Sequence, residues 1–213
     1  MRTGRPRGFC VEETLDRAMT VFWRHGYEGA SMSDLTAAMG INSPSLYACF
    51  GSKEGLFRAV LERYDERRKS FMESVLAAPT AAKVAETYLH GVADFAIDTS
   101  GKNPPGCLLL QSGLSCGDSE IPDAMARHRA EKEAALCDRF EQAREDADLP
   151  KSANAAALAR YLMTVSNGIC VQAASGASAE ELHDVATMAL MAWPGANAKT
   201  AKPKSKASAN VDD

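Results

Sequence analysis

The sequence is short of the features that mark several common classes of protein. None of its apolar stretches approaches the roughly 18 residues that a membrane-spanning helix needs, and its N-terminus lacks an apolar run of signal-peptide length. Its 213 residues contain no phosphate-binding glycine loop and no recognisable nucleophile–base pair. We therefore expect a cytoplasmic protein that spans no membrane and is not an enzyme, although a pocket in the fold could still bring catalytic groups together.

Cysteine is present, but not in the patterns that bind metal. The six cysteines include no Cys-x-x-Cys pair, the spacing typical of zinc cages. A metal site built from Cys116, His128 and Cys137 also lacks the usual ligand spacing. In a reducing cytoplasm structural disulfides are not expected either. The sequence thus predicts no bound metal and no cofactor.

Positive charge is scarce for a protein that would bind nucleic acid. The chain has 24 lysines and arginines against 28 aspartates and glutamates, a net charge of −4. The distribution matters more than the sum, because residues 1–10 carry three arginines and no acid. We expect a basic arm, residues 1–8, to bring Arg5 and Arg7 to phosphates or to the minor groove. The alternative is a merely solvated terminus.

Two short helical patterns meet at a glycine turn near the N-terminus. Ser31 is a good N-cap for the first, and Asp34 stands where a capping box has its acid. Gly40 can adopt the positive φ that ends this helix. Ser43 is expected to cap the second helix, with Pro44 at its first position. This arrangement predicts a helix-turn-helix, which places its second helix in the DNA major groove.

The flanking residues fit the same kind of domain. Val11, Leu15 and Phe22 fall on one face of an amphipathic helix, and Ser52 is a candidate cap for the helix that follows. Any helical protein can contain two short helices around a glycine, but here the supporting residues extend over 9–57. They are Ala18, Phe22, Gly26, Tyr27, Ser31, Leu35, Gly40, Ile41, Leu46, Tyr47, Phe50, Ser52, Lys53, Glu54, Leu56 and Phe57.

With these residues, 9–57 resembles the DNA-binding domain of the TetR/AcrR family of bacterial repressors. The resemblance implies a homodimer that binds double-stranded DNA at a palindromic operator, and a larger helical domain that binds a small-molecule effector. Ser43 stands where relatives often place a basic residue, and Cys49 where His or Tyr is common, so the resemblance leaves the operator sequence open. The positions expected to contact DNA are Arg5, Arg7, Ser31, Met32, Ser43, Pro44, Ser45, Tyr47, Cys49 and Lys53.

The expected fold class is all-α and TetR-like, with about nine helices. We place a three-helix DNA-binding domain at 1–52, with its helix-turn-helix at about 31–50, and an antiparallel helical bundle for effector binding and dimerisation at 53–194. A tail rich in Ala, Lys, Ser and Pro, residues 195–213, is expected to be disordered. One long helix over 53–76 would link the domains, and its charged stretch is expected to be a solvated face.

The last two helical patterns, at about 153–174 and 178–192, each carry an apolar stripe. In view of the resemblance, we expect them to form a four-helix interface between two subunits. The alternative is that both stripes belong to the chain's own core. The residues expected at the dimer interface are Leu158, Tyr161, Leu162, Val165, Ile169, Leu182, Val185 and Ala189.

Gly106–Leu109 reads Gly-Cys-Leu-Leu and resembles a subset of the family that carries this segment in the C-terminal domain. A pocket is expected between the linking helix and the helices after it. Its candidate residues are mostly apolar with few polar groups, which suits a small hydrophobic or amphipathic effector, although plain core would have the same composition. They are Phe71, Met72, Val75, Tyr88, Phe95, Cys107, Leu110, Gln111 and Leu114.

Cys107 suggests an alternative signal. It follows Pro-Pro-Gly at an expected helix start, where the helix dipole and free N–H groups favour a thiolate. A free cysteine is, however, usually a small buried hydrophobe, and Cys116 would lie nearly opposite on a continuous helix. The main prediction is therefore a homodimeric repressor released by a small effector, and the alternative is a thiol-based electrophile or redox sensor acting through Cys107.

Overall fold

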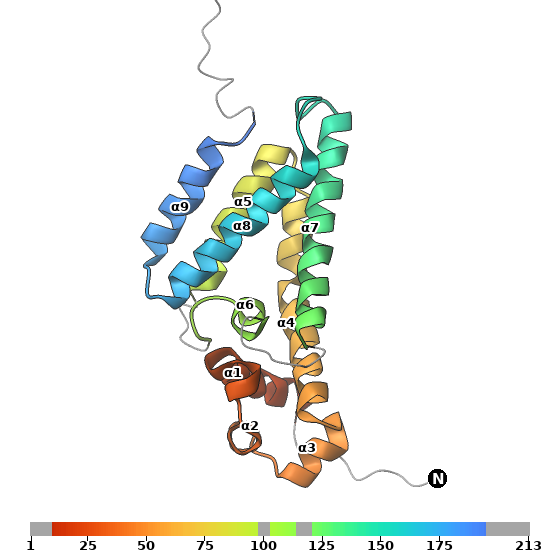
Figure 1. Ribbon diagram of the computed structural model, residues 1–213, viewed down its shortest axis with the longest axis vertical. Coiled ribbons are helices and arrows are strands. Elements are labelled where there is room, and N and C mark those ends of the chain that lie inside the picture. Colours follow the sequence, from red (N-terminus) through yellow and green to blue (C-terminus); the bar gives the residue numbers. More distant parts are fainter. Residues whose placement is uncertain (1–9, 98–102, 114–120, 195–213) are drawn as a thin grey trace, which may run out of the picture.

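The computed structural model describes residues 10–97, 103–113 and 121–194, and these residues form helices and their connections only (Figure 1). The predicted basic arm, 1–8, and the predicted tail, 195–213, lie outside them. The described residues form the helices α1 (Val11–Gly29), α2 (Met32–Met39), α3 (Ser43–Phe50), α4 (Lys53–Leu76), α5 (Ala81–Ala96), α6 (Leu108–Gly113), α7 (Ile121–Glu145), α8 (Ala155–Ala174) and α9 (Ala179–Met191).

Side-chain caps start α2 and α4 where the sequence predicts them. The Oγ atom of Ser31 accepts a hydrogen bond from the amide of Asp34 at 3.1 Å, and its hydroxyl donates to the Asp34 carboxylate at 2.6 Å. The Oγ atom of Ser52 accepts from the amide of Gly55 at 3.0 Å. Each cap satisfies an amide that the helix leaves without an internal partner. These caps fix where α2 and α4 begin, and therefore where α3 is held between them.

Helix α3 is capped one residue earlier than the sequence predicts. The cap is Asn42, whose Oδ1 accepts a hydrogen bond from the amide of Ser45 at 2.9 Å. The prediction of Ser43 as the cap was wrong because Asn and Ser are nearly equal N-caps and stand side by side here. Ser43 and Pro44 instead occupy the first turn of α3, and both are exposed.

Two glycines permit the tight turns on either side of α3. Gly40 ends α2 at φ 68° and ψ 28°, the left-handed conformation that costs other residues a steric penalty. At Gly55 a Cβ atom would lie 2.0 Å from the carbonyl oxygen of Phe50, which is the last residue of α3. Any other residue at this position would push α3 away from α4.

A first hydrophobic core joins the helix-turn-helix to the start of α4. The Phe22 and Phe57 rings meet edge to face with centroids 4.8 Å apart, and Leu46 fixes α3 to this core. Leu108 and Leu109 of α6 also belong to it. The helix-turn-helix therefore packs against a segment that comes more than forty residues after it in the chain.

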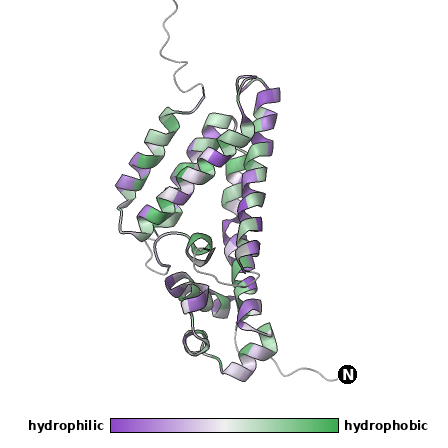
Figure 2. Cartoon of the chain, viewed as in Figure 1, coloured by the Kyte–Doolittle hydropathy of each residue, from purple (hydrophilic) through white to green (hydrophobic). Residues whose placement is uncertain are grey.

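A second hydrophobic core lies among α5, α7, α8, α9 and the end of α4, with Phe140 and Trp193 in ring contact at 5.2 Å. Figure 1 shows α4 running alongside α7, from α3 up to this core. Figure 2 shows α7 as more hydrophilic along its length than α5 and α8, as expected for a helix that covers the bundle from outside. None of the helices in the described ranges is both long enough and apolar enough to cross a membrane.

Ion pairs fasten α1 to α4. The Asp16 carboxylate accepts a hydrogen bond from Arg63 Nε at 3.2 Å and forms an ion pair with a terminal nitrogen of Arg67 at 2.6 Å. Charge-assisted hydrogen bonds of this kind are stronger than neutral ones. A tilt of α4 would therefore be passed to α1 and the helix-turn-helix.

Candidate nucleic-acid interface and effector cavity

Helix α3 presents most of its surface to solvent. Among its residues only Leu46 is fully buried, while the side chain of Tyr47 is 50% exposed. Ser43 and Pro44 are exposed as well, and Ser45 and Cys49 are partly so. This face has hydroxyl, thiol and aromatic groups that can meet base edges and phosphates.

The remaining predicted DNA contacts border α3. Lys53 lies at the start of α4, where its Nζ atom donates to the carbonyl oxygen of Glu28 at 3.3 Å and sits 4.6 Å from the centroid of the Tyr27 ring. Ser31 is exposed at the start of α2, and Met32 beside it is partly buried against the first core. Arg5 and Arg7 lie outside the described residues.

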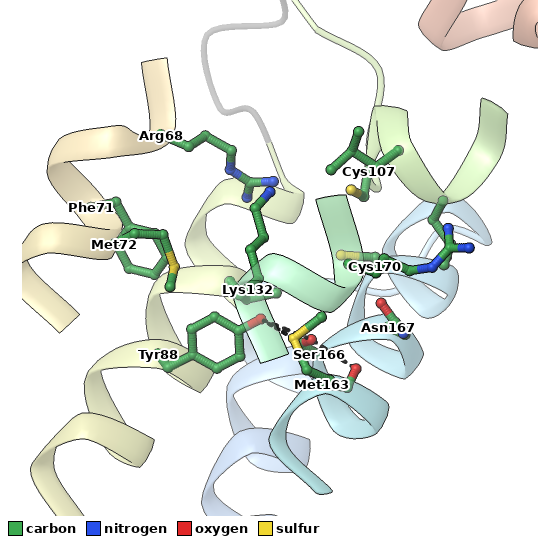
Figure 3. A pocket seen from close by; sticks show the side chains of 14 residues that line it. Arg68, Phe71, Met72, Tyr88, Cys107, Lys132, Met163, Ser166, Asn167 and Cys170 are labelled. Atoms are coloured by element: carbon green, nitrogen blue, oxygen red, sulfur yellow. Dashed lines mark hydrogen bonds between the residues drawn. The ribbon is translucent and has the colours of Figure 1, made fainter. Parts of the chain in front are cut away.

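A cavity lies among α4, α5, α6, α7 and α8 (Figure 3). It holds about 620 Å³ of empty space when the part open to solvent is included. Apolar side chains form most of the wall, and hydroxyl, thiol, amide and cationic groups form the rest. The lining residues are Arg68, Phe71, Met72, Tyr88, Val92, Cys107, Leu109, Leu110, Arg129, Lys132, Met163, Ser166, Asn167 and Cys170.

Part of the predicted pocket lines this cavity and part does not. Val75 is fully buried in the second core and is absent from the lining. Phe95 was predicted to point inward, yet it is 44% exposed and covers the outer edge of the Phe71 ring, with centroids 4.9 Å apart. The side chain of Gln111 and all of Leu114 lie outside the described part of the chain. The predicted residues that do line the cavity are Phe71, Met72, Tyr88, Cys107 and Leu110.

The cationic and α8 sides of the cavity were not predicted from the sequence. Arg68 belongs to a charged stretch that was interpreted as a solvated face, but α4 turns its side chain toward the bundle. Arg129 and Lys132 come from α7, far away in the chain, and have no local sequence signal. Ser166 and Asn167 did offer one, because they interrupt the apolar stripe of α8 with polar groups.

Cys107 lies at the polar end of the cavity among several hydrogen-bonding groups. Its Sγ atom is 3.4 Å from the Tyr64 hydroxyl. A hydrogen bond from the Cys170 thiol and the positive charge of Arg68 hold the pKa of Cys107 well below its usual range, despite its burial. The hydrogen bond to Cys107 and burial raise the pKa of Cys170. The pair therefore favours a thiolate at Cys107 beside a protonated Cys170.

Tyr64 connects this end of the cavity to α1. Its ring meets Trp23 edge to face with centroids 5.4 Å apart. Arg68 donates a hydrogen bond to its hydroxyl. Burial raises the pKa of Tyr64 well above its ordinary value, so the hydroxyl stays protonated. Cys107, Arg68, Tyr64 and Trp23 thus form a continuous set of contacts from the cavity to the helix-turn-helix domain.

The α8–α9 face has an open apolar groove, but not all of the predicted interface residues reach it. Leu162 and Ile169 are fully buried in the second core, so their prediction as interface residues was wrong. Helical spacing alone does not distinguish a stripe that faces the core from one that faces a partner. Leu158 is half-buried, and the Tyr161 hydroxyl donates to the carbonyl oxygen of Ala189 at 2.8 Å, which joins α8 to α9.

Other side chains of α8 and α9 make the groove apolar. Val165, Val185 and Ala189 line it, with the nearly buried Leu182 beside them. Met188 also lines it and is 66% exposed. Large apolar side chains are seldom gathered and exposed in this way on a surface without a partner.

Comparison with known proteins decides the family. Residues 15–60 match the profile of bacterial regulatory proteins of the tetR family. Over 195 residues, which cover 90% of this chain and 92% of the relative, the sequence is 34% identical to the HTH-type transcriptional repressor ComR of Escherichia coli (strain K12). The chain belongs to the TetR family. Its sequence is also 28% identical to the HTH-type transcriptional repressor BdcR of the same organism, over 87% of this chain and 90% of BdcR.

Solved structures place the fold in the TetR family as well. A cysteine mutant of the TetR family transcriptional regulator CifR, in complex with 26-base-pair double-stranded operator DNA, is 38% identical. The match has a TM-score of 0.84 and covers 89% of this chain and 100% of that one. The predicted TetR-like all-α fold is thus confirmed. The chain is a DNA-binding transcriptional repressor of the TetR family and not an enzyme.

Proposed function

We propose that this TetR-family repressor binds a palindromic operator as a homodimer and leaves it when a small amphipathic molecule enters the cavity among α4–α8. The observation that carries the proposal is the position of the cavity. Its wall includes Cys107 and Leu109, and the α6 leucines also pack in the core of the helix-turn-helix domain. A ligand there touches the segment that positions α1.

In this proposal α3 contacts base edges and the groups around it contact phosphates. Tyr47, Ser43 and Ser45 have exposed or partly exposed hydroxyl groups on α3 that can donate to or accept from base edges, with Cys49 beside them. Lys53 and the arm with Arg5 and Arg7 would supply the charge that aligns the protein on the duplex. As expected from the sequence, this proposal assigns DNA binding to residues 1–52 and regulation to residues 53–194.

The dimer in this proposal forms through α8 and α9. Two helices from each subunit make a four-helix interface around the exposed Val185, Met188 and Met191. Operator palindromes match such two-fold symmetry, because each half-site then meets an identical α3. The dimer thus sets the distance between the two recognition helices.

Release in this proposal is a shift between two dimer conformations. The effector binds more tightly to the one in which the recognition helices no longer match two successive major grooves, and the shift cannot exceed that difference in affinity. Cavity contacts reach α1 through Tyr64 and Trp23, and α4 is tied to α1 by Asp16. Helix α4 therefore both contacts the ligand and is attached to the DNA-binding domain.

A matched pair of lysine variants tests the DNA-binding side. Lys53→Ala removes a proposed phosphate contact, whereas Lys83→Ala removes a lysine of α5 that pairs with Glu86 far from α3. The slope of log affinity against log salt concentration should fall by about 1 for each lost phosphate contact in Lys53→Ala and stay at the wild-type value in Lys83→Ala. Equal slopes in both variants would contradict the assignment of Lys53.

A second candidate signal is covalent modification of Cys107, since the neighbouring Cys170 thiol and Arg68 favour its thiolate. The Gly-Cys-Leu-Leu segment supports the further proposal that the chain belongs to the subset of the family that the sequence resembles. Cys107→Ser tests this second candidate. It should abolish release from DNA by alkylating agents and preserve release by reversible ligands. If alkylating agents still release Cys107→Ser, the second candidate is wrong.

A further inference from the structure

We propose that the effector of this repressor is an organic anion, a molecule with one acidic head group and an apolar tail. The inference rests on the proposed function and narrows the class of ligand that the cavity among α4–α8 takes. Arg68, Arg129 and Lys132 would hold the head group, and the wall around Phe71 and Tyr88 would cover the tail.

Apart from the Cys107 thiolate, the charged side chains in the described lining of the cavity are all of one sign. Three of the described lining residues are cationic and none is acidic. Figure 3 shows the nitrogen ends of the Arg68 and Lys132 side chains directed toward one another from α4 and α7. A cavity lined by charges of one sign attracts ligands of the opposite sign, and does so strongly where apolar walls exclude water.

Within the described residues, the Arg68 and Arg129 guanidinium groups have no carboxylate partner. Arg68 donates to the Tyr64 hydroxyl and lies 5.1 Å from the Tyr64 and Phe95 rings, but it forms no ion pair with any acidic residue of the described ranges. Arg129 makes no hydrogen bond or ion pair within those ranges either. A buried guanidinium without a counter-ion is costly, and a planar carboxylate can accept two parallel hydrogen bonds from one arginine.

Lys132 differs from the two arginines. Its Nζ atom lies 3.2 Å from the Asp65 carboxylate, which also lies 2.8 Å from Nδ1 of His128. Asp65 therefore neutralises part of the positive charge at this edge of the cavity. The head group of the ligand should accordingly bind nearer to Arg68 and Arg129 than to Lys132.

The rest of the cavity requires an apolar tail. The Phe71 and Tyr88 rings stack with centroids 6.4 Å apart, and Val92, Leu110 and Met163 continue the wall. The Tyr88 hydroxyl is occupied by Met163 Sδ at 3.2 Å and by Ser166 Oγ at 3.3 Å. Small hydrophilic anions would gain nothing from this surface, whereas an alkyl or aryl chain would bury apolar area against it.

The proposal makes a prediction for Cys107 that separates it from covalent sensing. A thiolate at Cys107 competes with a bound anion for the positive charge of Arg68. Cys107→Ser removes that competitor, so a reversible anion should bind at least as tightly to this variant as to the wild type. Covalent sensing predicts a different change in the same variant, the loss of release from DNA by alkylating agents.

Isothermal titration of the full-length protein with three ligands that share one tail tests the proposal. Octanoate should bind, octan-1-ol should bind at least about tenfold more weakly, and octylamine should not bind, because only octanoate has a negatively charged head group that can accept two parallel hydrogen bonds from a guanidinium. Arg129→Gln and Arg68→Gln should each weaken octanoate about 10- to 100-fold. Lys69→Gln, which removes an exposed charge of α4 outside this cavity, should leave octanoate affinity unchanged.

Three results would overturn the proposal. One is that octan-1-ol or octylamine binds as tightly as octanoate. Another is that both arginine variants keep wild-type affinity, and Arg129→Gln matters most here because this side chain has no described partner whose loss could unfold the protein. The third is that octanoate, decanoate and 4-butylbenzoate all fail to bind. Operator binding, measured on the same preparations, separates this failure from failure of the proposed repressor, which would instead lack specific DNA binding.

Discussion

Gly91 controls the shape of the cavity through Phe71. A Cβ atom at Gly91 would lie 2.2 Å from Cε2 and 2.6 Å from Cζ of the Phe71 ring, so Gly91→Ala must displace that ring. Overpacking of this kind costs about 1–3 kcal/mol. Replacing a helical glycine by alanine gains about 0.5–1 kcal/mol. The free energy of unfolding should therefore fall by about 0–2.5 kcal/mol.

The background Phe71→Leu isolates the clash. With the ring removed, Gly91→Ala should stabilise the protein by about 0.5–1 kcal/mol, the gain of alanine in a helix. Urea unfolding of the four proteins at one protein concentration gives the coupling energy. Because the displaced ring fills the cavity, Gly91→Ala should also weaken octanoate and leave operator affinity unchanged. The same change in unfolding free energy in both backgrounds would refute the reasoning.

Three further predictions concern α3, the dimer face and the thiol pair. Leu46→Ala should lower the free energy of unfolding by about 2–5 kcal/mol, since Leu46 is the fully buried side chain of α3. Urea unfolding measures this change, and a loss well under that range would mean that contacts other than those of Leu46 hold α3 in place. Met188→Glu should sediment as a monomer, whereas the control Thr164→Glu, which changes an exposed residue of α8, should sediment as the wild type does. A Met188→Glu protein that is still a dimer would show that the groove between α8 and α9 is not the dimer interface. Because the pKa of Cys107 is lowered, Cys107 should stay a thiolate, and its alkylation rate should stay level from alkaline to neutral pH. Burial raises the pKa of Cys137, so the alkylation rate of Cys137 should fall over the same range. Peptide mass spectrometry measures both rates, and parallel pH profiles for the two cysteines would contradict this prediction.

The DNA-binding half was predictable from sequence because its signals are local. Caps, turn glycines and apolar spacing act within a few residues, so Ser31, Gly40 and Ser52 were placed correctly. The one error, Ser43 in place of Asn42, arose where two good caps are adjacent. In such a segment the hydrogen-bond geometry, and not residue type, decides the boundary.

Residues 53–194 were less predictable because their contacts join segments distant in the chain. Cys170 lies in α8 yet acts on Cys107 before α6, and no spacing rule connects them. Arg68 lies in a charged stretch whose sequence does not distinguish it from its solvent-facing neighbours. The packing of α4 in the bundle shows that Arg68 faces a cavity. Leu162 and Ile169 show the same limit, since an apolar stripe does not reveal which neighbour covers it.

Binding of the full-length protein to its own upstream DNA tests the central claim most directly. A fluorescent fragment of that DNA is titrated at a stated salt concentration with random DNA as competitor, since affinity without salt is uninterpretable for a protein of this kind. The account predicts saturable binding that resists the competitor, at one dimer or a whole number of dimers per site, and release by octanoate. Binding no tighter than to random DNA, across all genomic fragments in a selection, would contradict it.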